Sequence, residues 1–152
     1  MKLIQSRDNA FFKQLRKLAE SGRERRKAGQ TLLDGVHLVE SYEKIIAPLD
    51  TLVVAESALA GGEIADYLAG REVVVLADAL MRELGLVDTP SGIMAVANLP
   101  SNERILDPMA DAVLLDGIQD PGNLGSILRS AAAAGFRQVL LSFDCAQAWS
   151  PK

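Results

Sequence analysis

Short runs of aliphatic and β-branched residues alternate with amphipathic stretches along most of the chain. The runs that predict strands cover residues 31–33, 51–54, 73–76 and 92–97. The stretches with apolar residues at helical spacing cover residues 35–47, 64–69 and 79–84. Such alternation builds a sheet covered by helices, because each strand buries its apolar side chains against neighbouring helices. The N-terminal part of the chain is therefore predicted to have an α/β fold.

A polar segment bounded by Pro100 and Pro108 separates these elements from a second α/β stretch. The pattern beyond it predicts a strand at residues 112–115, a loop at 116–122, a helix at 123–134 and a strand at 139–141. Two strands and one helix leave most of a sheet unpaired, so the second domain is expected to be incomplete. We place the domains at residues 1–99 and 111–152, with a linker at 100–110.

The first 27 residues predict a basic helix that breaks near Gly22. Apolar residues from Phe11 to Ala19 recur at helical spacing and are expected in the core, and Asp8 or Asn9 can cap the start. This segment holds nine of the 16 basic residues but only three of the 20 acidic ones, a balance of +6 in a chain of net charge −4. A basic edge on an acidic protein favours polyanion binding, because phosphate contacts release counterions. A solvated helix face is the alternative interpretation.

The composition excludes several classes of protein. Apolar residues make up 49% of the chain and charged residues 24%, which is typical of a globular protein rather than a disordered one. No run reaches the roughly 20 apolar residues of a membrane-spanning helix, and the start lacks a secretion signal, so a cytoplasmic protein is expected. Cys145 is the lone cysteine. Cys145 and His37 together are too few ligands for a zinc site, which usually needs four, so we expect no metal and assign neither residue a role.

A glycine-containing loop joins the first strand of the second domain to its helix. Gly117, Gly122 and Gly125 lie where backbone amides and a helix N-terminus can approach an anion. Their spacing matches neither the dinucleotide-binding fingerprint nor the phosphate loop of ATPases, which weakens the hypothesis of a nucleotide-dependent enzyme. Asn123 is expected to cap the helix, and Gly135 supplies a C-terminal stop.

The same segment contains a longer pattern. Asn123, Gly125 and Arg129 read N-x-G-x-x-x-R, preceded by Asp-x-x-x-Asp-Pro-Gly from Asp116 to Gly122. This pattern resembles the first motif of the SpoU/TrmH family of RNA ribose 2′-O-methyltransferases, within the SPOUT superfamily. The resemblance covers essentially the whole chain through further stretches at residues 6–9, 25–27, 33–40 and 148–152.

The resemblance implies a mixed-sheet N-terminal domain similar to kink-turn-binding ribosomal proteins, followed by the start of a knotted α/β methyltransferase domain. It implies S-adenosylmethionine as the methyl donor, structured RNA, above all rRNA, as the substrate, and a homodimer as the full-length assembly. In the family, the cofactor pocket comes largely from two later motifs, one with a glutamate and one with a serine and an asparagine. Both are expected beyond Lys152, so that this chain alone binds RNA and is inactive.

The resemblance also implies roles for individual residues. Arg129 is expected to clamp a phosphate and stabilise the developing alkoxide of the ribose, because a guanidinium stays protonated. A part for this arginine in activating the hydroxyl is left open. Asn123 would orient the ribose or the loop, unless it serves as the helix cap, while Gly122 and Gly125 allow close approach. Phosphate contacts are expected from the basic side chains Lys13, Arg16, Lys17, Arg23, Arg25, Arg26 and Lys27.

Two other interpretations are retained beside the methyltransferase. One is a non-catalytic RNA-binding module in which the N-x-G-x-x-x-R pattern is vestigial. The other is the nucleotide-dependent enzyme, which the missing glycine fingerprints disfavour. Sequence beyond Lys152 separates the first alternative from the methyltransferase, because absence of the two later motifs would favour the module.

Overall fold

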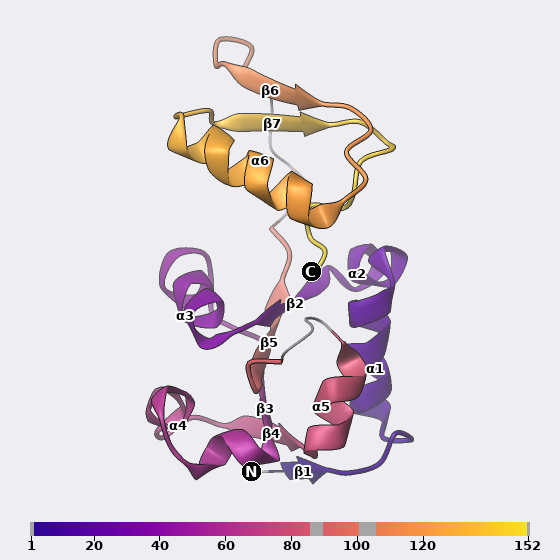
Figure 1. Ribbon diagram of the computed structural model, residues 1–152, viewed down its shortest axis with the longest axis vertical. Helices are drawn as coiled ribbons and strands as arrows, with labels where there is room; N and C mark the ends of the chain where they lie inside the picture. Colours follow the sequence, from indigo (N-terminus) through magenta and orange to yellow (C-terminus); the bar gives the residue numbers. More distant parts are fainter. Residues whose placement is uncertain (1, 86–89, 101–105, 152) are drawn as a thin grey trace. The chain divides into compact units, whose positions relative to one another are not determined.

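The computed structural model describes residues 2–85, 90–100 and 106–151, with the backbone alone for Lys2. These residues form two compact units that divide between Leu99 and Pro100 (Figure 1). Within the expected linker, residues 101–105 lie outside the described residues. Each unit contains a sheet of its own.

The first unit is built on a five-stranded mixed sheet. Its strands are β1 (Lys2–Ile4), β2 (Gln30–Asp34), β3 (Thr51–Ala55), β4 (Val73–Leu76) and β5 (Ile93–Asn98). They lie in the order β1-β4-β3-β5-β2. Strand β4 pairs in parallel with β1 and β3, whereas β5 pairs antiparallel with β3 and β2. The predicted mixed α/β fold is confirmed.

Helices cover both faces of this sheet (Figure 1). They are α1 (Ala10–Glu20), α2 (Gly22–Ala28), α3 (Val36–Ile45), α4 (Glu63–Leu68) and α5 (Asp78–Leu84), with a 3₁₀ helix, η1 (Glu56–Ala60), after β3. On one face, Phe12 of α1 and Leu80 of α5 share a core with Val53 of β3. On the other, Val39 of α3 packs in a core with Val54. Successive residues of a strand point to opposite faces, so β3 contributes to both cores.

The N-terminal segment differs from the single interrupted helix that the sequence predicts. Its first residues form β1, which pairs with the distant β4, a long-range pairing that a three-residue run does not reveal. The Asn9 side chain caps α1 by accepting hydrogen bonds from two backbone N–H groups of the first turn. The break falls at Ser21 rather than Gly22, and the Ser21 hydroxyl accepts from the Glu24 amide to begin α2. One residue therefore ends α1 and caps α2.

The second unit consists of two parallel strands, β6 (Ala112–Leu115) and β7 (Gln138–Leu141), connected by α6 (Pro121–Ala133). Leu124 and Ala131 bury the inner side of α6, whereas Leu114 on β6 is 77% exposed. The helix begins two residues earlier than predicted because Asp120 caps it, its carboxylate accepting from the Asn123 backbone N–H at 2.7 Å. The prediction that Asn123 is the N-cap is wrong.

Candidate nucleic-acid interface and motif helix

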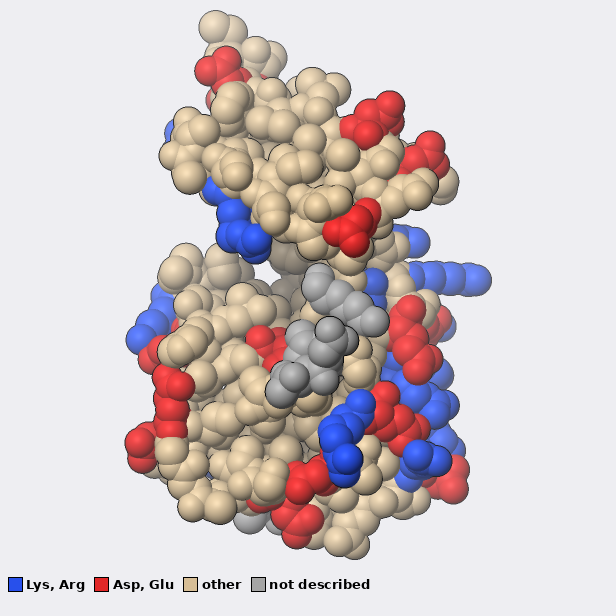
Figure 2. All heavy atoms as spheres, viewed as in Figure 1, with Lys and Arg blue, Asp and Glu red and all other residues tan. Residues whose placement is uncertain are grey.

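Basic side chains gather along α1 and α2 of the first unit, interspersed with acidic ones (Figure 2). Two of them are engaged within the protein: Lys13 pairs with Asp8 at 2.9 Å, and Arg16 lies 3.9 Å from Glu83. The other exposed cations form no ion pair with any residue in the described parts of the chain. We call these four residues the basic corner: Lys17, Arg23, Arg26 and Lys27.

Arg25 departs from the sequence prediction, because its side chain is buried and only 6% exposed. Its Nη1 donates to the backbone carbonyl of Leu18 at 2.7 Å and to that of Ala19 at 3.2 Å. Burial, together with the nearby Arg26 guanidinium, lowers the pKa of Arg25. The prediction that Arg25 contacts RNA is therefore corrected: it binds the C-terminal carbonyls of α1 and holds α2 against them.

The motif residues lie along α6, which follows β6. Arg129 is exposed, and its Nη2 donates to the Ser126 hydroxyl at 3.2 Å. Its Nη1 lies over Gly125, where an added Cβ would sit 3.7 Å from it. Gly125 and Arg129 are one turn apart on the same side of the helix, so a side chain at position 125 would contact the Arg129 guanidinium, whereas glycine does not. The structure thus brings Gly125, Ser126 and Arg129 together, while the Asn123 side chain is exposed nearer the start of the helix.

Gly122 has a local structural reason. A Cβ at this position would lie 3.1 Å from the Asp120 carboxylate, closer than most contacts of this kind. Glycine therefore leaves room for the Asp120 side chain to reach the first turn of α6. The Asp120 carboxylate therefore occupies the N-terminus of α6 with a negative charge of the protein itself. This corrects the expectation that the helix start is open to an anion.

The loop before α6 is tied to the segment after β7. The Gly117 N–H donates to the Ser142 hydroxyl at 3.2 Å, and the Ala146 N–H donates to the Ile118 carbonyl at 2.6 Å. Cys145 is half-buried in this segment, and its thiol donates to the Leu115 carbonyl at 3.3 Å. These contacts tie the end of β6 and the loop that leads to α6 to the segment after β7.

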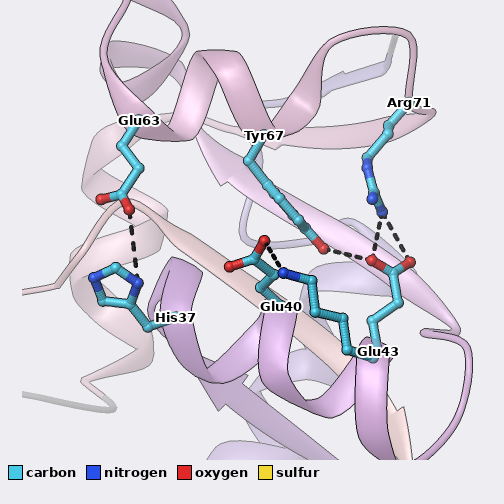
Figure 3. Close-up of polar contacts among 7 residues, drawn as sticks. His37, Glu40, Glu43, Glu63, Tyr67 and Arg71 are labelled. Atoms are coloured by element: carbon cyan, nitrogen blue, oxygen red, sulfur yellow. Dashed lines mark hydrogen bonds and ion pairs between the residues drawn. The ribbon is translucent and has the colours of Figure 1, made fainter.

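A cluster of charged and polar residues on α3 and α4 was not predicted from the sequence (Figure 3). The Glu43 carboxylate accepts from the Tyr67 hydroxyl at 2.9 Å and from Arg71 at 2.8 and 2.9 Å, and the Arg71 guanidinium lies 4.3 Å from the centre of the Tyr67 ring. The hydrogen bond from Arg71 lowers the pKa of Glu43, and burial with the Glu43 bond raises the pKa of Tyr67 to about 12. This network joins α3 to α4 and serves packing. Nearby, His37 lies 3.6 Å from Glu63 on the surface.

Among the helices that the structure describes, none is long and apolar enough to cross a membrane. No group of three or more His, Cys, Asp or Glu side chains lies together as a potential metal site in the described part of the chain.

Comparison with known proteins identifies both units. The model of the MRM3-like substrate binding domain matches residues 9–95, and that of the SpoU rRNA Methylase family matches residues 111–152. The chain has an MRM3-like substrate binding domain followed by a segment of the SpoU rRNA Methylase family. The resemblance inferred from Asn123, Gly125 and Arg129 is thereby confirmed.

Relatives of this SpoU chain are bacterial and mitochondrial. It is 32% identical to RlmP of Bacillus subtilis (strain 168), a 23S rRNA (guanosine(2553)-2'-O)-methyltransferase, over 100% of this chain and 59% of RlmP. It is 32% identical to mitochondrial rRNA methyltransferase 3 of Xenopus tropicalis over 89% of this chain and 34% of that protein. The structure of the SpoU methyltransferase AviRb from Streptomyces viridochromogenes, in complex with AdoMet, matches with a TM-score of 0.79 and 28% identity over 95% of this chain and 57% of AviRb. The SpoU chain thus spans little more than half the length of RlmP and AviRb.

Proposed function

We propose that the SpoU chain belongs to an S-adenosylmethionine-dependent RNA 2′-O-ribose methyltransferase that acts on rRNA. The observation that carries this proposal is the N-x-G-x-x-x-R motif on a helix that follows a parallel strand, with Arg129 exposed over Gly125. The rRNA methyltransferase names of RlmP and the mitochondrial relative support the substrate class. The cytoplasmic location and a full-length homodimer stay predictions.

Arg129 suits a reaction that develops negative charge on a ribose oxygen. As the 2′-hydroxyl loses its proton and attacks a methyl group, the nascent alkoxide needs a fixed cation close to it. A guanidinium is always protonated and has five N–H donors, and one bond to Ser126 leaves others for a phosphate and the alkoxide. Arg129 is therefore proposed as the catalytic residue, and Asn123 as a residue that orients the ribose.

The AdoMet complex of AviRb supports S-adenosylmethionine as the methyl donor. In the described part of this chain the Asp120 carboxylate caps the N-terminus of α6, and the family resemblance assigns most of the cofactor pocket to two later motifs. We therefore keep the proposal that the cofactor pocket lies mostly beyond Lys152. Methyl transfer by residues 1–152 alone, measured with labelled S-adenosylmethionine and rRNA, would overturn it.

The first unit is proposed to be the RNA substrate-binding domain. The match to the MRM3-like substrate binding domain supports this assignment, as do the exposed cations of the basic corner, which pair with no acidic residue that the structure describes. In the same scheme the second unit is the first part of the methyltransferase domain. The alternative, a non-catalytic RNA-binding module, predicts RNA binding without methyl transfer by the full-length protein.

The test of catalysis uses Arg129→Ala in the full-length protein, with methyl transfer to rRNA measured under single-turnover conditions. Loss of one charge-stabilising group is expected to reduce the rate by about 100-fold or more. Arg137→Ala removes another exposed arginine from the same unit and is expected to leave the rate unchanged. Turnover near the wild-type rate in Arg129→Ala, with circular dichroism unchanged, would refute the assignment.

A further inference from the structure

The two sides of α2 carry arginines with opposite environments. Arg25 faces inward and is buried, whereas Arg23, Arg26 and Lys27 are exposed. The three exposed residues are three and four positions apart, which places them on one helix face with about 5–6 Å between neighbouring Cβ atoms. This spacing is close to the step between successive phosphates of one nucleic-acid strand. One face of α2 can therefore follow a single strand of backbone.

Contacts with α1 hold this face in a fixed direction. The Ser21 hydroxyl caps α2 directly after α1 ends, and Arg25 bonds the Leu18 and Ala19 carbonyls of the last turn of α1. Lys17 lies in that same turn, on the other arm of the corner. The cations are consequently set on two short helices at a fixed angle, so they complement a rigid array of phosphates better than a flexible strand.

Stacking platforms are missing from this surface. All of residues 10–28 are described, and their two aromatic side chains are Phe12, which is fully buried, and Phe11, which packs against the same core. Proteins that bind single-stranded RNA stack exposed bases on aromatic side chains, whereas double-stranded RNA is recognised through its shape and backbone. Fixed cations without aromatic residues match the second mode.

We propose that the basic corner binds the sugar-phosphate backbone of double-stranded RNA. This inference rests on the proposed RNA-binding role of the first unit and specifies the form of RNA that it binds. Four phosphate contacts predict that the logarithm of the association constant falls with the logarithm of salt concentration with a slope of roughly −3.6, using the value known for duplex DNA. Sequence has little influence, because phosphate contacts carry no base information.

The test measures binding of residues 1–152 by fluorescence anisotropy to three probes: a short RNA duplex, one of its strands alone in an unstructured sequence, and a DNA duplex of the same sequence. The RNA duplex is expected to bind at least about 5-fold more tightly than the single strand. Arg26→Gln/Lys27→Gln is expected to reduce the slope by roughly 1.8 and the affinity by on the order of 10-fold at about 0.1 M salt. Lys44→Gln/Arg82→Gln removes the same charge from α3 and α5 and is expected to leave both quantities nearly unchanged.

The possible outcomes separate this inference from the proposed function. Equal or tighter binding of the single strand would overturn the duplex assignment while leaving RNA binding intact. Equal binding of the DNA duplex would also overturn it, because the site would then respond to charge density alone. Failure of every RNA probe to bind would instead overturn the RNA-binding role itself. Equal losses in the two double variants, with unchanged circular dichroism, would remove the basic corner as the binding surface.

Discussion

Arg25→Met tests whether Arg25 serves the fold rather than RNA. The substitution keeps an unbranched side chain in the space of the arginine stem but removes the donors that reach the Leu18 and Ala19 carbonyls. A hydrogen bond from a charged donor contributes about 1.5–3 kcal/mol, and the 2.7 Å bond to Leu18 is the stronger of the two. The bond to Ala19 is longer and only partly buried, so water can replace much of it.

One opposing effect reduces the expected loss. Burial disfavours the charged guanidinium, as the lowered pKa of Arg25 shows, and methionine removes that cost. The net destabilisation is therefore expected to be about 2 kcal/mol, below the sum of the two bonds. For a domain of this size, that lowers the melting temperature by roughly 8–16 °C.

The assay is thermal unfolding of the first unit by circular dichroism, with urea unfolding as a second measurement. Arg26→Met is the matched control, because it removes the same group from the next position of the same helix, where the side chain is exposed. It is expected to change stability by no more than about 0.5 kcal/mol but to weaken RNA binding. If the two variants melt within about 2 °C of each other, the structural role assigned to Arg25 is refuted.

In a Tyr42→Phe background, ultraviolet titration should show Tyr67 ionising near pH 12. Because the pKa of Tyr67 is raised in the folded protein, its contribution to stability is complete below the unfolded pKa of about 10 and is lost as the pH rises from about 10 to about 12. Ionisation of Tyr67 at its ordinary pKa would contradict this prediction. Gly92 has φ +89°, and a Cβ added there would lie 3.1 Å from the Cβ of Ala58, whereas Gly70 has φ +76° and open space around it. Gly92→Ala should therefore destabilise the protein by roughly 1–3 kcal/mol more than Gly70→Ala. Equal urea midpoints for the two variants would show that packing at Gly92 is loose. Asp120→Ala should lower stability by about 1 kcal/mol because it removes the cap of α6, whereas Asp120→Asn should retain most of that stability because asparagine can also cap a helix. Identical melting temperatures for both variants and the wild type would exclude this capping role.

The sequence predicts the elements well where the signal is local. The strands at 73–76 and 112–115 coincide with β4 and β6, and Asn9 caps α1 as one of the two expected residues. In contrast, β1 depends on pairing with a strand about seventy residues away, and a short run of this kind carries no period of its own. The prediction of the α6 cap failed for another reason, because Asp120 and Asn123 are both good N-cap residues. The helix starts at Pro121, so Asp120 is the residue placed to accept from its free N–H groups.

The candidate site shows the same division between local and long-range information. The sequence predicted that Gly125 and Arg129 lie on one helix, and the structure places them on the same side of it, because four residues make about one turn. It did not predict the Glu43–Tyr67–Arg71 network, in which Tyr67 and Arg71 have suitable spacing but Glu43 comes from another helix. Charge counting identified the basic segment as a whole and could not assign a role to each arginine within it.

The position of the break between α1 and α2 decides which arginine is available to RNA. With the start of α2 fixed at Ser21, a rotation of about 100° per residue places Arg25 nearly opposite Arg23 and Lys27 and about 100° away from Arg26. Free carbonyls at the end of α1 then lie on the inner side, where a guanidinium can satisfy them. The sequence alone predicted the break at Gly22, which does not reveal that Arg25 can reach the free carbonyls of α1. All the basic residues of the segment therefore looked equally available to RNA. Helices α1 and α2 thus combine one arginine, Arg25, that builds the basic corner with the four cations that the corner presents. Loss of charge at Arg25 should lower stability, whereas loss of charge at Arg26 should lower affinity for RNA.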